Sequence, residues 1–104
     1  MNIQYLKEVT DVLAGFMNEN GFSSEGQDLG CFKGEYKIYR VSYDEAKKTF
    51  AVEVCPVESE NFTLLSTWFF DETDHGARDT ACIGEDFLEA IAKDAGITVV
   101  KIAD

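Results

Sequence analysis

The sequence has few of the residues on which common catalytic and metal sites depend. Its 104 residues include one histidine, His75, and three cysteines, Cys31, Cys55 and Cys82, with no Cys-x-x-Cys pair. Tetrahedral zinc sites normally draw on such pairs, and a cysteine nucleophile would have to use the single histidine as its base. The sequence also has no glycine-rich phosphate loop. We therefore expect no metal, no cofactor and no enzyme activity.

Positive charge and long apolar runs are also scarce. The chain has 9 lysines and arginines against 20 acidic residues, a net charge of −11. A surface of this sign repels nucleic acid and anionic membranes, so we expect neither as a partner. No apolar run approaches the roughly 20 residues that span a bilayer. With no signal-peptide pattern and an odd number of cysteines, the sequence favours a cytoplasmic protein with reduced thiols.

The negative charge is unevenly distributed. Residues 58–94 contain ten acidic residues, and the only basic residues among them are Arg78 and Lys93, whereas most other basic residues lie between Lys33 and Lys48. Two interpretations stay open: the acidic half meets a basic or amphipathic partner, or it only keeps an apolar core soluble.

What the sequence does have is apolar and aromatic content, 45% hydrophobic with eight Phe and four Tyr, enough for one domain spanning residues 1–104. Apolar residues at three- and four-residue steps predict a first helix that ends near Glu19. Asn20 and Gly21 suit a left-handed cap, with Phe22 folding back onto the last turn. The apolar stripe consists of Ile3, Leu6, Val9, Leu13, Phe16 and Met17.

Alternating and β-branched segments predict an antiparallel meander. Residues 36–43, 49–55 and 62–70 have strong strand patterns, and residues 29–33 form a weaker one. Pro56 should end the second strong strand, because proline cannot donate to a ladder.

A second helix should follow and stop at Gly96. Its start is open, either at a cap among Asp71, Thr73 and Asp74 or, because Gly84 weakens a helix, near Glu85. Its buried stripe should be Ile83, Phe87, Leu88, Ile91, Ala92 and Ala95. Residues 97–102 read as a final strand, whose abrupt end would suit a chain that continues into a longer protein.

These elements predict an α+β domain, a helix, a three- to four-stranded antiparallel meander and a helix, with both helices on one sheet face. In element order, acidity and size, residues 3–95 resemble the secretion-chaperone-like domains and small bacterial domains of unknown function. That resemblance implies a module that dimerises or holds an unfolded segment of a partner protein. No motif matches, so no functional residue is carried over.

The strands carry more aromatic surface than one packed face requires. If helices cover one face, the other should be an apolar surface that binds a protein partner or a second copy of the chain. We expect this surface to contain Tyr39, Val41, Tyr43 and Phe69. The other strand register would give this role to Tyr36, Ile38 and Trp68.

The alternative site is the acidic turn from Asp71 to Cys82. With Asp71 at position 1 of a calcium loop, Gly76 would fall at position 6, but position 12 would be Cys82 instead of a bidentate glutamate. A small ligand or metal bound at this turn is therefore the second hypothesis, and a capped strand-to-helix turn is the simpler interpretation.

Overall fold

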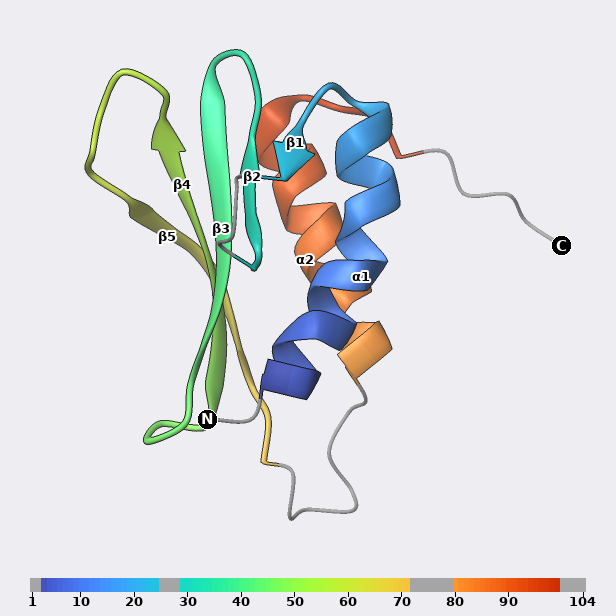
Figure 1. The fold of residues 1–104 in the computed structure, drawn as a ribbon, viewed down its shortest axis with the longest axis vertical. Coiled ribbons are helices and arrows are strands. Elements are labelled where there is room, and N and C mark those ends of the chain that lie inside the picture. The colour runs from blue at the N-terminus through green and yellow to red at the C-terminus, as the bar shows by residue number, and fades with distance from the viewer. Residues whose placement is uncertain (1–2, 25–28, 72–79, 100–104) are drawn as a thin grey trace, which may run out of the picture.

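The computed structural model describes residues 3–24, 29–71 and 80–99 (Figure 1). Within them the chain forms two helices and five strands in the order α1, β1 to β5, α2. Their bounds are α1 Ile3–Glu19, β1 Ser23–Ser24, β2 Cys31–Lys33, β3 Lys37–Asp44, β4 Thr49–Pro56, β5 Thr63–Phe69 and α2 Thr80–Ala95. None of the described helices is long and apolar enough to cross a membrane.

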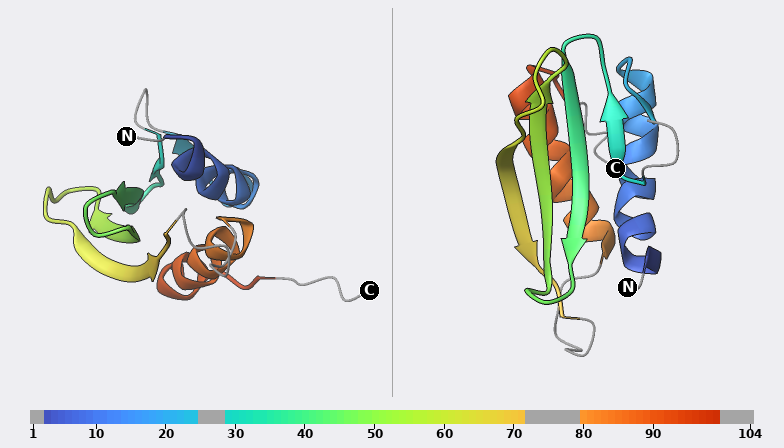
Figure 2. Two further views of the ribbon diagram at one scale, coloured as in Figure 1. Left: turned by 90° about the horizontal axis from the view of Figure 1, so that it is seen from below. Right: turned by 60° about the vertical axis from the view of Figure 1, so that its left-hand side comes forward.

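The strands form one antiparallel sheet in the order β1-β2-β3-β4-β5, so every neighbour in space is also a neighbour in sequence. Both helices lie on the same side of this sheet (Figures 1 and 2). The predicted α+β class, the helix-sheet-helix order and the single covered face are confirmed. β1 was not predicted, since its two serines carry no apolar pattern.

The element ends follow from local chemistry. The amide of Phe22 donates to the carbonyl of Met17 at 2.9 Å, and Gly21 has a positive φ of 86°, as expected for a left-handed cap. Gly96 ends α2 in the same way, with a φ of 72°. The predicted final strand is wrong for residues 97–99, which form no strand, and its remainder lies outside the described residues.

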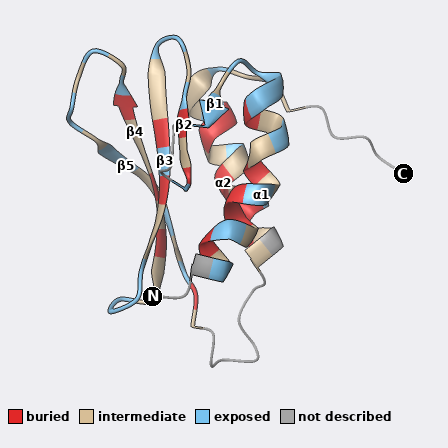
Figure 3. Cartoon of the chain, in the orientation of Figure 1, coloured by how far each residue is buried: buried red, intermediate tan, exposed pale blue. Residues whose placement is uncertain are grey.

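The core lies between the sheet and the two helices (Figure 3). Each helix contributes its predicted apolar stripe, except for Ile3, whose side chain is not described. The helix-facing side of β3 and β4 contributes aromatic and β-branched side chains. The fully buried side chains include Val9, Leu13, Met17, Tyr39, Val41, Phe50, Val52, Ile83, Phe87 and Ile91.

The two helices approach closely at Gly84. A Cβ atom at this position would lie 2.7 Å from Cβ of Val12 on α1, closer than two carbon atoms can pack. α2 spans Thr80–Ala95 and continues through Gly84, so the alternative start near Glu85 is wrong. Of the other candidate caps, Thr73 and Asp74 lie outside the described residues. The Thr80 hydroxyl donates to the carboxylate of Glu8 at 2.8 Å, which ties the start of α2 to α1.

A polar cluster fixes the end of α2 to β3. The carboxylate of Asp94 accepts hydrogen bonds from the Lys37 ammonium at 2.9 Å and the Tyr39 hydroxyl at 2.8 Å. Burial, the hydrogen bond to Asp94 and the charge of Asp94 all raise the pKa of Tyr39. Burial also acts to raise the pKa of Asp94, but the hydrogen bonds from Lys37 and Tyr39 and the lysine charge outweigh it and lower that pKa.

Candidate protein-binding face

The sheet face away from the helices is the candidate site, and strand pairing decides which side chains reach it. Tyr39 pairs with Val54, and Val41 pairs with Val52, so these residues share one face. The helices cover that face, where Tyr39 and Val41 are buried. Side chains of opposite parity, such as Arg40 and its partner Glu53, therefore lie on the open face.

The predicted assignment of Tyr39, Val41 and Tyr43 to the open face is wrong. All three belong to the helix-facing side, where Tyr43 is half-buried and donates its hydroxyl to the carbonyl of Phe70 at 2.9 Å. Both tyrosine hydroxyls find an acceptor, so both rings can enter the core without an unsatisfied polar atom. Phe69 is 65% exposed, as predicted, and its binding role stays a prediction.

The alternative register is only partly right. Tyr36 is 76% exposed just before β3, and Ile38 is half-buried. Trp68 pairs with Phe50 and packs against the core on the helix-facing side. Neither predicted set therefore lies on one face, because the β5 residues were assigned to the wrong sets: Phe69 pairs with Thr49 on the open face, and Trp68 pairs with Phe50 on the helix-facing side.

The centre of the open face is polar. The Arg40 guanidinium forms an ion pair with Glu53 at 3.2 Å and lies 3.8 Å from the ring centroid of Phe62. Both members of the ion pair are satisfied, so this part of the face has little need of a partner. Ser42 pairs with Ala51 beside it, adding small side chains and no apolar patch.

The apolar surface is concentrated on β5. Leu64 is 59% exposed and Phe69 is 65% exposed, and both pair with β4 residues whose side chains lie on the open face. A bulge in β5 explains the exposure of Leu64, because Val52 pairs with Ser66 and the next residue, Glu53, pairs with Leu64, which leaves Leu65 as the extra residue. It turns Leu64 toward solvent while Leu65 packs against the core. No pattern in the sequence indicates this bulge, so the exposure of Leu64 was not predicted.

Cys55 lies on the open side of β4 but is buried beneath the loop that follows. Its thiol contacts the carbonyl oxygens of Ser59 at 2.9 Å and Pro56 at 3.2 Å. Among the three cysteines, Cys55 is buried and Cys31 is only partly buried. The loop therefore closes one end of the open face, and β5 is the part that stays accessible.

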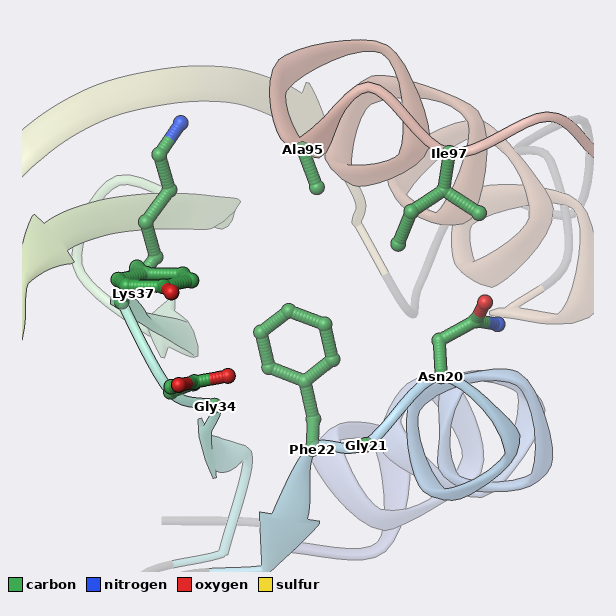
Figure 4. Close-up of a pocket in the computed structure, with 9 residues that line it drawn as sticks. Asn20, Gly21, Phe22, Gly34, Lys37, Ala95 and Ile97 are labelled. Atoms are coloured by element: carbon green, nitrogen blue, oxygen red, sulfur yellow. The ribbon is translucent and has the colours of Figure 1, made fainter.

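A separate cavity of about 340 Å³ lies where the two helices end beside the β2–β3 turn (Figure 4). Phe22 points into it, with Asn20 and Ile97 on one side and Gly34 and Lys37 on the other. The ring of Phe22 rests on Gly34, where a Cβ atom would lie 2.5 Å from it. The Lys37 ammonium is already bonded to Asp94, so the walls offer mainly apolar contact.

The alternative site at the acidic turn lies largely outside the described residues. Asp71 forms an ion pair with Lys48 at 3.1 Å, and Cys82 lies in α2. Residues 72–79, including His75 and Gly76, are not described. No group of three or more metal-ligating side chains occurs in the described ranges.

Comparisons with known proteins identified no relative of this chain. No family model matches the chain, and no curated protein or solved structure matches it either. The resemblance to secretion-chaperone-like domains is therefore one of element order alone, and function must be argued from the site.

Proposed function

We propose that this chain is a protein-binding module that uses the β5 side of its open sheet face, either for a partner protein or for a second copy. The observation that carries the proposal is the exposure of Leu64 and Phe69 on a sheet whose other face is covered by both helices. Leu64 and Phe69 lie near opposite ends of β5, and large exposed apolar side chains on one strand face are typical of contact surfaces.

The acidity of the chain supports a protein partner over other classes. A net charge of −11 opposes binding to nucleic acid or to anionic lipid, whereas it attracts a basic protein segment. The polar centre at Arg40 and Glu53 limits the apolar contact area to the β5 side. A contact whose apolar area is restricted to one strand suits a transient interaction better than an obligate one.

The test replaces both exposed side chains in a double variant, Leu64→Lys with Phe69→Lys. Because neither side chain is in the core, the variant should fold with nearly unchanged stability. Leu29→Lys is the matched control, since Leu29 is also an exposed apolar residue but lies before β2. Light scattering over a range of protein concentrations would measure self-association, and retention on immobilised protein would measure partner binding.

The proposal predicts that a dimer, or a retained partner, is lost in the double variant and kept in Leu29→Lys. A monomer at every concentration that retains the same proteins in all three forms would contradict it.

A further inference from the structure

Within the described residues, the long edge strand of the sheet is β5. The described strand order begins with β1 and ends with β5, so these two strands form the sheet edges. β1 has only two residues, whereas β5 has seven. A long edge strand presents unpaired N–H and C=O groups that can form a ladder with another chain.

The backbone parity of β5 identifies the groups that face outward. The amide of Phe70 donates to the carbonyl of Lys48 on the β4 side at 2.8 Å. Successive amides in a strand point in opposite directions, so the N–H groups of Phe69 and Thr67 point away from β4. Thr67 pairs with Ala51 in the regular part of the ladder, past the bulge.

The sequence of β5, TLLSTWF, lacks the usual protection of an edge strand. Natural edges carry charged side chains or proline that prevent pairing with other strands. β5 has neither, in a chain in which 28% of residues are charged. Two of the four large exposed apolar residues of the described chain, Leu64 and Phe69, also belong to β5.

Charge around this edge favours a basic occupant. Glu58 and Glu60 are exposed in the loop that leads into β5, and neither forms an ion pair within the described part of the chain. A second copy would bring another net charge of −11 to the same edge. An extended segment with lysine or arginine at its ends would instead gain attraction to Glu58 and Glu60.

We propose that the partner supplies an extended, basic segment that adds to β5 as a further strand of the sheet. Its backbone pairs with the outward groups of Thr67 and Phe69, and its alternate apolar side chains extend the surface of Leu64 and Phe69. The basic end that lies beside Thr63 faces Glu58 and Glu60. This inference rests on the proposed function and specifies how that site is occupied.

The probe is a synthetic peptide that alternates valine and threonine between paired lysines at each end. Trp68 is the only tryptophan of the chain and lies on β5, so its fluorescence should report binding directly. Two matched peptides separate the contributions. In one, N-methyl groups on alternate amides block a ladder but keep the side chains, and in the other glutamates replace the lysines.

Two variants test the protein side. Thr67→Pro removes an outward N–H but no bond to β4, because proline is tolerated on an edge strand at that position. Thr67→Val keeps this N–H and is its control. A double variant, Glu58→Gln with Glu60→Gln, removes the proposed partners of the lysines without a change of size.

We expect the lysine peptide to bind wild type and Thr67→Val, and to bind Thr67→Pro at least about tenfold more weakly, a loss of about 1.4 kcal/mol. The N-methylated and glutamate peptides should bind at least as weakly as that, and the Gln double variant should reduce the preference for lysine. Circular dichroism should show that Thr67→Pro is folded.

The experiments distinguish a failure of the strand-addition model from a failure of the proposed protein-binding function. If Leu64→Lys with Phe69→Lys abolishes binding but Thr67→Pro and N-methylation do not, the face binds a partner without an added strand, and the inference is wrong. Absence of binding by the lysine peptide at about 1 mM, the weak end of specific recognition, also overturns it. If the wild-type protein is a dimer that dissociates in Thr67→Pro, the strand that adds to β5 comes from a second copy of the chain, and the proposal of a basic segment is wrong.

Discussion

Tyr39 illustrates how a single residue can mislead a prediction made from pattern alone. Tyrosine is common at contact surfaces, and its place in an aromatic strand is equally consistent with either face. The burial of Tyr39 depends on Asp94, 55 positions later, whose carboxylate accepts a hydrogen bond from the tyrosine hydroxyl at 2.8 Å. No local pattern indicates such a distant acceptor, so the sequence could not assign the face.

Removal of the Tyr39 hydroxyl should therefore destabilise the domain. Tyr39→Phe keeps the buried ring but deletes a hydrogen bond to a charged carboxylate, which is typically worth about 1.5–3 kcal/mol. Urea unfolding should show a loss in this range. Tyr36→Phe is the control, because Tyr36 is 76% exposed and should change little. An unchanged unfolding free energy in Tyr39→Phe would mean that this hydrogen bond contributes no net stability.

The same cluster should give the domain a dependence on pH at both extremes. Folding lowers the pKa of Asp94, so its contribution is complete above the ordinary value of 3.8 and is lost as the pH falls through the lower pKa of the folded state. Folding raises the pKa of Tyr39, so its contribution is complete below the ordinary value of 10.0 and declines as the pH rises from there toward the higher folded-state pKa.

Urea unfolding measured across the pH range would check this dependence. The alkaline decline in stability should be smaller in Tyr39→Phe than in wild type, and the acid decline should be smaller in Asp94→Asn. Curves of identical shape in wild type and both variants would place the titrating groups elsewhere.

At the scale of elements, the periodicity of apolar residues was sufficient to predict a helix or strand wherever the tertiary packing agrees with the local preference of the segment. The stripe of α1, the three long strands and the stop of α2 at Gly96 could all be predicted from the sequence. β1 could not, because its pairing with β2 depends on the preceding turn and not on apolar residues. The apolar run after Gly96 was read as a strand, but residues 97–99 have no strand partner among the described residues.

Gly84 shows a packing requirement overriding helix propensity. Alanine would favour the α2 helix locally, but its Cβ atom would lie 2.7 Å from Val12. Gly84→Ala should therefore destabilise the domain by about 1–3 kcal/mol through overpacking. Gly15→Ala is the contrasting change, since no atom lies within 4 Å of a Cβ there, and it should stabilise α1 by about 0.5–1 kcal/mol.

Unfolding experiments on both variants would compare these opposite effects. The double variant Gly84→Ala with Val12→Ala should recover only a small part of the loss, because alanine removes the two Cγ atoms of Val12 at 3.0 and 3.1 Å but keeps its Cβ atom at 2.7 Å. If Gly84→Ala stabilises the domain as Gly15→Ala does, the helices do not approach as closely as the structure places them.

At the scale of the whole molecule, the two-layer arrangement and the net charge of −11 act together. Helices on one side leave the other side of the sheet and its β5 edge accessible (Figure 2), while the charge decides which chains approach. The single covered sheet face and the acidic character of the chain could both be predicted from the sequence. The sequence did not predict that the large exposed apolar side chains within the described strands are both on β5, because this depends on the Arg40–Glu53 ion pair and on the bulge that exposes Leu64.

Salt should separate the two kinds of occupant, because it screens charge of either sign. Added sodium chloride should weaken binding of the lysine-flanked peptide, since attraction to Glu58 and Glu60 assists it. The same salt should strengthen any pairing of two copies through β5, because it screens the repulsion between chains of net charge −11. Fluorescence titration of Trp68 at several salt concentrations would measure the first effect, and light scattering under the same conditions the second. Peptide affinity that is insensitive to salt, in wild type and in Glu58→Gln with Glu60→Gln alike, would show that the acidic loop plays no part in choosing the partner.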